Sequence, residues 1–145
     1  MGDAVTPTGE FEVHPRLLGG SHMLGRLENC QVLLKDNSHF AWFILVPEVG
    51  VEELHELGAD DYRRLGEATR VVSEFVAREF APDKVNVAAI GNQVRQLHVH
   101  VVGRRTSDPA WPGVVWGCDA RRAYPAAEVE RISGRFAGEP GVRAC

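Results

Sequence analysis

The sequence has little of what marks several classes of protein. Its three cysteines, Cys30, Cys118 and Cys145, are widely spaced and form no C-x-x-C pair. This pattern predicts reduced thiols, and neither a disulfide framework nor a paired-cysteine zinc site. No run approaches the ~20 apolar residues of a membrane span, and the first residues lack the basic and apolar segments of a secretory signal. We therefore expect a cytoplasmic protein that does not associate with a membrane.

Excess positive charge is also missing. Sixteen Lys and Arg residues stand against 20 Asp and Glu residues, so the net charge is −4. This balance argues against nucleic-acid binding through a broad basic surface. Apolar residues make up 44% of the chain and charged residues 25%, which is an ordinary globular composition. A length of 145 residues, with no internal repeat and no linker, predicts one domain over residues 1–145.

Hydrophobic periodicity predicts an α+β protein with an antiparallel sheet. Two hairpins are expected, joined by a long amphipathic helix that Asp60 caps. We expect no regular element over residues 17–27, because glycines interrupt that stretch. The expected strands are residues 11–13, 30–34, 40–46, 85–90 and 96–102, and the expected helices are residues 51–57, 65–80 and 126–136.

One predicted strand has an unusual polar face. Residues 96–102 alternate polar and apolar, so Gln96, His98 and His100 project from one side of a strand. A solvent-facing row more often carries Lys, Glu, Thr or Ser. Two imidazoles and an amide on one face indicate a site that acts on a phosphate, holds a metal, or only forms hydrogen bonds.

The residues around this strand favour an anion. Gly91 lets a ligand approach the backbone closely, and Asn92 and Gln93 follow it in the turn before the strand. Arg104 and Arg105 come directly after the strand, where we expect them to place positive charge beside the histidines. Amide, imidazole and guanidinium groups together suit an oxyanion such as phosphate.

A metal centre is the alternative. Side chains two residues apart on a strand can reach the same ion, but zinc needs three or four protein ligands. Gln96 is a poor third ligand, and no other histidine has an evident spacing relation to His98 and His100. We therefore assign no metal ligands and keep a histidine-based metal site as an alternative.

The motif resembles that of the histidine triad (HIT) superfamily of nucleotide hydrolases and transferases. The family strand reads His-φ-His-φ-His-φ-φ, where φ is apolar, and residues 96–102 differ from it only at Gln96. The turn at residues 91–94 is similar to the family's Gly-Gln-Ser/Thr-Val, and residues 40–47 are similar to its buried strand ending in proline. The resemblance covers about residues 28–105, which leaves residues 106–145 as a C-terminal extension.

The resemblance implies a five-stranded antiparallel sheet with a long helix and a C-terminal helix packed on it, usually in a homodimer. It implies hydrolysis of a nucleoside phosphoanhydride or phosphoramidate, with no cofactor. His98 would attack the α-phosphate to form a nucleotidyl-histidine, and His100 would hydrogen-bond the phosphate oxygens. Substrate-binding roles would fall to Asn92, Gln93, Gln96 and either Asp36 or Asn37, the last two being candidates for the ribose. The segment from Trp111 to Gly117 is similar to a bacterial subgroup labelled diadenosine tetraphosphate hydrolase-like.

Two departures from the family pattern keep other functions open. Gln96 replaces the first histidine of the triad, and Ala41-Trp42 stands where the family has Gly-His. Trp42 is interpreted as a core residue, and His39 could supply a missing polar contact. A nucleotide-binding module with weak catalysis is therefore an alternative, beside the metal-binding protein.

Overall fold

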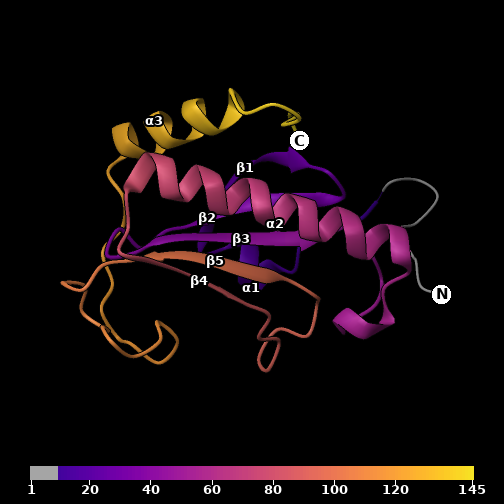
Figure 1. Ribbon diagram of the computed structural model, residues 1–145, viewed down its shortest axis with the longest axis horizontal. Coiled ribbons are helices and arrows are strands. Elements are labelled where there is room, and N and C mark those ends of the chain that lie inside the picture. The colour runs from indigo at the N-terminus through magenta and orange to yellow at the C-terminus, as the bar shows by residue number, and fades with distance from the viewer. Residues whose placement is uncertain (1–9) are drawn as a thin grey trace.

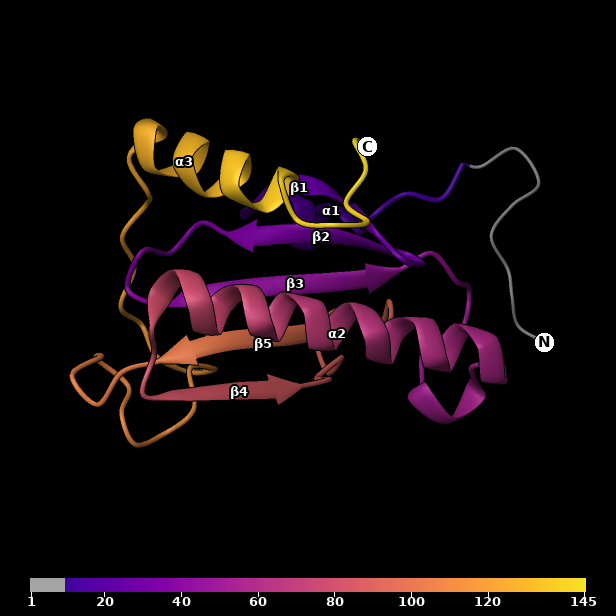
Figure 2. The same cartoon turned by 45° about the horizontal axis from the view of Figure 1, so that its top comes forward.

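The apolar and alternating runs of the sequence form a five-stranded antiparallel sheet in the computed structural model, which describes residues 10–145. The strand order is β1-β2-β3-β5-β4, as Figure 2 shows, and every neighbouring pair is antiparallel. This architecture confirms the predicted α+β class. The strands are β1 (Ser21–Leu27), β2 (Cys30–Lys35), β3 (Ala41–Pro47), β4 (Lys84–Ala88) and β5 (Val99–Arg104).

Two helices, α2 (Ala59–Phe80) and α3 (Ala126–Ala137), cover one face of this sheet. The long amphipathic α2 packs on β3 and β5, and α3 packs near β1 (Figure 1). The predicted helix at residues 51–57 is reduced to a single 3₁₀ turn, η1 (Leu54–Glu56). A short helix, α1 (Pro15–Leu18), begins at a proline, which suits the first turn because its missing N–H has no helical partner there.

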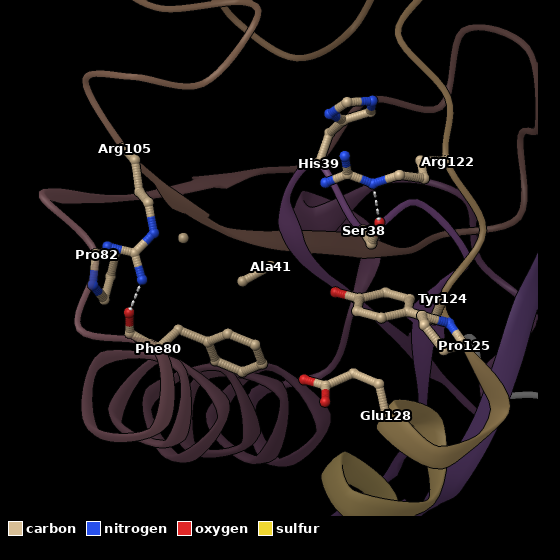
Figure 3. A pocket seen from close by; sticks show the side chains of 11 residues that line it. Ser38, His39, Ala41, Phe80, Pro82, Arg105, Arg122, Tyr124, Pro125 and Glu128 are labelled. Atoms are coloured by element: carbon tan, nitrogen blue, oxygen red, sulfur yellow. Dashed lines mark hydrogen bonds between the residues drawn. The ribbon is translucent and has the colours of Figure 1, made fainter.

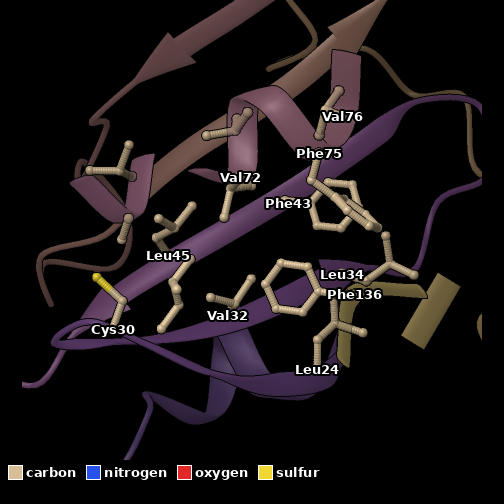
Figure 4. Packing of buried hydrophobic residues seen from close by; sticks show 14 of the residues in the cluster. Leu24, Cys30, Val32, Leu34, Phe43, Leu45, Val72, Phe75, Val76 and Phe136 are labelled. Atoms are coloured by element: carbon tan, nitrogen blue, oxygen red, sulfur yellow. The ribbon is translucent and has the colours of Figure 1, made fainter. Parts of the chain in front are cut away.

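The main core lies between the helices and the sheet. The predicted apolar stripe of α2 packs against buried side chains of β2 and β3 on the helix-covered face of the sheet (Figure 4). Phe75 is at the centre, with its ring 5.9 Å from that of Phe43 on β3 and 5.2 Å from that of Phe136 on α3. The buried residues on α2 are Leu65, Ala68, Val72, Phe75 and Val76.

A second apolar cluster covers the opposite face of the sheet. Along β3, Phe43 and Leu45 belong to the main core, whereas Trp42 and Ile44 belong to the second cluster. The prediction that this strand is buried on both faces is therefore confirmed. The second cluster is closed by Leu17 of α1 and by Val115 and its neighbours after β5. The histidines lie on this face.

Strand β1 was not expected, because glycines interrupt its sequence. Its pairing with β2 shifts register between Met23 and Gly25, and Gly25 has a φ of +152°. A Cβ on Gly25 would lie 2.8 Å from the carbonyl oxygen of Arg143. The glycine that interrupts the apolar pattern thus permits a bulge against the C-terminal chain.

Other parts of the prediction also differ from the structure. Residues 11–13 are not a strand. Strand β5 begins at Val99, where its pairing with β3 begins at Leu45, and its pairing with β4 begins one residue later, between His100 and Ala88. Gly58, and not Asp60, is the N-cap of α2. Asp60 lies in the first turn, where its charge complements the helix dipole.

Candidate functional site

His100 is held by the pairing of β3 and β5. It lies opposite Ile44, so Trp42 is its diagonal neighbour on the same face of the sheet. The Trp42 indole Nε1–H donates to Nδ1 of His100 over 2.9 Å. An indole nitrogen can only donate, so Nδ1 is an acceptor and the proton of the neutral ring is on Nε2.

His98 has the opposite tautomer. Its Nδ1 lies 2.7 Å from the backbone carbonyl oxygen of Gln96, which can only accept. Nδ1 is therefore protonated, and Nε2 carries the lone pair. The centroid of the His98 ring is 4.8 Å from that of His100, at an interplanar angle of 70°.

Both imidazoles are neutral at pH 7. Burial lowers the pKa of His98, an effect that its bond to the Gln96 carbonyl partly opposes. Burial also lowers the pKa of His100 to about 3, with further lowering by electrostatic interaction with His98 and Lys35. The pair thus presents one basic nitrogen and one N–H donor.

A cavity of about 450 Å³ lies over these rings. The structure brings four of the predicted site residues to its lining, namely Asn92, Gln93, His98 and His100. Apolar side chains from α1, β3 and the segment after β5 complete the wall. Polar and apolar groups both contribute to its surface, and a cavity of this size with convergent polar groups is typical of a small-molecule site.

The positive charge at this cavity comes from residues that the sequence reading missed. Arg16, Lys35 and Arg121 line it. The Arg16 guanidinium donates to Oε1 of Gln93 over 3.2 Å, and the Lys35 ammonium lies 5.3 Å from the centre of the Trp42 ring. Burial, followed by the charge of Arg121, lowers the pKa of Lys35. Lys35 follows the buried Leu33 by two residues, so strand alternation could have placed it on this face.

The two arginines predicted to serve the histidines lie elsewhere. Arg104 is 2% exposed and binds Asp108 through two hydrogen bonds of 2.8 and 3.0 Å and Asn86 through one of 2.9 Å. Arg105 donates to the carbonyls of Phe80 and Ala81 at the end of α2. The prediction of a guanidinium beside the imidazoles is therefore wrong for both residues.

Gln96 does not line the cavity. Its Oε1 accepts from the backbone N–H of His14 over 2.8 Å, and its Nε2 donates to the carbonyl of Glu12 over 3.0 Å. The side chain thus ties the segment before α1 to the strand that carries the histidines. Its predicted role in direct substrate contact does not fit this placement, because both of its polar groups already have partners.

Asp36, Asn37 and His39 also lie outside the cavity. Asp36 pairs with His22 at 3.1 Å and accepts from the Tyr124 backbone N–H over 2.9 Å. Asn37 is fully buried and bonds the Ala120 carbonyl and the His39 N–H, which makes it a turn residue. These local partners are why neither side chain reaches the site as the predicted ribose ligand.

Two indoles give the cavity its aromatic wall. The ring of Trp116 lies 5.0 Å from that of His100 and 5.8 Å from that of Trp42, both in edge-to-face contact. Trp116 belongs to the segment that closes the second cluster. Aromatic rings beside cations suit a ligand with a flat ring and a negative charge.

A second lobe adjoins the first. It has a volume of about 400 Å³ and shares Asn92 and His98 with the larger cavity. Its charged lining residues are Glu52, Glu53 and Arg95, and Arg95 pairs with Glu52 at 3.0 Å. Folding also brings His55 to this lobe. His98 therefore stands between a cationic lobe and a more acidic one.

A separate cavity of about 430 Å³ lies where the end of α2 meets the start of α3 (Figure 3). None of the predicted catalytic or substrate-binding residues lines it, although His39 does. Its guanidinium groups are already engaged, Arg105 with the carbonyls at the end of α2 and Arg122 with Oγ of Ser38 over 2.8 Å. This cavity is not part of the histidine site.

Two further findings concern metal ligands and membrane-spanning helices. Among residues 10–145, no group of three or more His, Cys, Asp and Glu side chains could hold a metal ion. Over the same residues, no helix is long and apolar enough to span a membrane.

Comparison with known proteins identifies the class. The model of the HIT domain family matches residues 20–107, and the chain therefore belongs to the HIT family. No curated protein matches it. HIT proteins are typically nucleotide-binding hydrolases or transferases, and they often form dimers.

Solved structures extend this result over most of the chain. A histidine triad protein from Sinorhizobium meliloti is 36% identical, with a TM-score of 0.84, over 88% of this chain and 95% of that one. One from Marinobacter aquaeolei is 39% identical, with a TM-score of 0.82, over 87% and 93%. One from Bradyrhizobium japonicum is 34% identical, with a TM-score of 0.82, over 86% and 93%.

Proposed function

We propose that this HIT protein hydrolyses a nucleoside phosphoanhydride or phosphoramidate through a nucleotidyl-histidine intermediate on His98. The observation that carries the proposal is the 2.7 Å contact between Nδ1 of His98 and the Gln96 carbonyl. It leaves an unprotonated Nε2 on a buried, neutral ring that lines the cavity. A neutral imidazole is a good nucleophile near pH 7.

The chemistry has two steps. Nε2 of His98 attacks the α-phosphorus, and the bond from phosphorus to the leaving group breaks, its electron pair departing with that group. Water then attacks the same phosphorus, loses a proton to the solvent and breaks the P–N bond, which returns the electron pair to Nε2. Phosphoryl transfer is catalysed largely by positioning and by donors around the developing charge.

The remaining roles follow from the lining. The Nε2–H of His100 and the amides of Asn92 and Gln93 are donors for the phosphate oxygens, and Arg16 offsets their charge. We assign the nucleoside to the lobe with the aromatic wall and three cations, and the leaving group to the lobe shared by Asn92 and His98. Diadenosine tetraphosphate and adenosine phosphoramidate are test substrates for the two bond types.

A rapid-quench labelling experiment tests the proposal. Protein is mixed with adenosine phosphoramidate or diadenosine tetraphosphate that is labelled at the α-phosphate, then quenched and separated from free label. We expect an acid-labile adduct that His98→Asn abolishes. His39→Asn, which removes an imidazole from the separate cavity, is the matched control and should label normally. Turnover retained in His98→Asn would remove His98 as the nucleophile. Binding without labelling or turnover would contradict a hydrolase and favour the nucleotide-binding module.

We also propose a homodimer in the cytoplasm. Strand β4 is an edge of the sheet, and Val87 on it is 51% exposed. An unpaired edge is open to pairing with a second sheet. Light scattering of the eluted protein should give twice the chain mass, and a monomer at micromolar concentration would contradict the dimer.

A further inference from the structure

The indole of Trp42 is fixed from several sides. Its ring makes edge-to-face contacts with Phe40 at 6.1 Å and with Trp116 at 5.8 Å, and the Lys35 ammonium lies 5.3 Å from its centre. The side chain is 5% exposed. Its Nε1–H therefore has one stable direction, toward Nδ1 of His100 at 2.9 Å.

We infer that Trp42 is a positioning residue, which holds His100 as a neutral imidazole with its proton on Nε2. A proton on Nδ1, in either the other neutral tautomer or the cation, would face the indole N–H and break the hydrogen bond. The ring is thereby committed to donating from Nε2. Its use as a donor to a phosphate oxygen rests on the proposed function, whereas the tautomer does not.

A comparison within the same cluster separates this role from packing. Trp116 also touches His100, but its Nε1 is buried without a hydrogen-bond partner. An indole in this cluster therefore need not be bonded to pack. The Nε1–H of Trp42 would otherwise be buried without a partner, and it donates instead to the lone pair on Nδ1 of His100. This hydrogen bond is therefore a specific interaction and not only packing.

The surrounding charges act in the same direction. Four groups that can carry positive charge line this cavity with His100, namely His98 beside the ring, Lys35 from β2, Arg16 from α1 and Arg121 from the segment after β5. The thiol of Cys118 also lines it. Among the described residues, no carboxylate lines this cavity. Protonation of His100 would place another positive charge among these groups, in a buried position.

Nitrogen NMR of the wild-type protein tests the tautomer directly. In ¹⁵N-labelled protein, long-range correlations distinguish a nitrogen that bears a proton from one that bears a lone pair, and His100→Gln assigns the signals. We expect a lone-pair Nδ1 and a protonated Nε2 on His100, and a scalar coupling across the hydrogen bond from Trp42 Nε1 to His100 Nδ1. A protonated Nδ1, or no coupling, overturns the inference without any substitution in the core.

Two matched substitutions test the cause. Trp42→Phe keeps an aromatic ring but removes the N–H, so His100 should become a mixture of tautomers and should titrate at higher pH. Trp116→Phe makes the same change of side chain at an indole that forms no hydrogen bond to His100, and it should leave the tautomer of His100 unchanged. Equal effects of the two variants, or a retained single tautomer in Trp42→Phe, would contradict a positioning role.

Kinetics connect the tautomer to catalysis. Trp42→Phe should lower kcat about 2- to 12-fold, the population change that corresponds to a net hydrogen bond of about 0.5–1.5 kcal/mol, with little change in KM. A changed tautomer with an unchanged kcat would reject the donor role of His100 and keep the role of Trp42. Absence of turnover in the wild type would reject the proposed hydrolase and leave the NMR result standing.

Discussion

Mild acid should destabilise this protein through His100 before its carboxylates titrate. The ordinary histidine pKa is 6.5, and burial lowers the pKa of His100 to about 3 in the folded protein. Between these two values the unfolded chain binds a proton that the folded chain does not. The free energy of unfolding therefore falls as pH falls below 6.5, and this contribution is complete when pH reaches about 3.

The size of the effect follows from proton linkage. Between pH 7 and pH 5 a single group with these two pKa values removes about 2 kcal/mol from the free energy of unfolding. His98 acts in the same direction by a smaller amount, because its Gln96 bond opposes the effect of burial on its pKa. A loss of about 2 kcal/mol is a large part of the ~5–15 kcal/mol typical of a domain.

Urea unfolding at pH 7, 6 and 5, followed by far-UV circular dichroism, measures this loss. His100→Gln is the test variant, because its amide oxygen can still accept from the Trp42 indole. Its loss of stability from pH 7 to 5 should be about 2 kcal/mol smaller than that of the wild type. The matched control is His55→Asn, which replaces an exposed imidazole by an amide. Equal slopes for His100→Gln and the wild type would refute a neutral, buried His100.

Three further changes have outcomes that the structure determines. Because burial lowers the pKa of His98, kcat/KM should fall in acid with a midpoint below pH 6.5, and a midpoint above 6.5 in the pH–rate profile would contradict a buried neutral nucleophile. Asp108→Ala leaves the Arg104 guanidinium buried without its partner, so urea unfolding should show a loss of about 3–5 kcal/mol, and a loss under 1 kcal/mol would contradict the buried pair. Gln96→His removes the hydrogen bonds from Gln96 to the segment before α1 and so loosens Arg16, which should raise KM without raising kcat. Steady-state kinetics measure both constants, and a higher kcat in the variant would show that Gln96 limits catalysis.

The parts of the fold that could be predicted are those whose signal is local. The buried apolar stripe of α2 repeats at helical spacing from Leu65 to Val76, and the alternation of β3 places its side chains in two cores. Strand β1 could not be predicted, because the bulge at Gly25 is shaped by Arg143, which is 118 residues away in the chain. The N-cap at Gly58 has no side chain to signal it.

In the candidate site, too, the residues that could be predicted are those with a local sequence signal. His98, His100, Asn92 and Gln93 are close in sequence, and the structure brings them to one cavity. The cations come from α1, β2 and the segment after β5, which only the folded chain brings together. Arg104 was predicted to bind an anion beside the histidines, but Asp108, four residues later, pairs with it and neutralises its charge. A carboxylate that close in sequence was a signal against a role in anion binding.

The two departures from the family motif have different consequences for catalysis. The group that orients His98 is the backbone carbonyl of residue 96, and a backbone carbonyl is present whatever the side chain. Gln96 therefore leaves Nε2 of His98, which we propose as the nucleophile, unchanged, and its side chain fixes the segment that precedes α1 and Arg16. Trp42, by contrast, bonds directly to the second imidazole and determines where its proton lies. The substitution with the greater influence on the chemistry is thus the one on β3, outside the histidine strand.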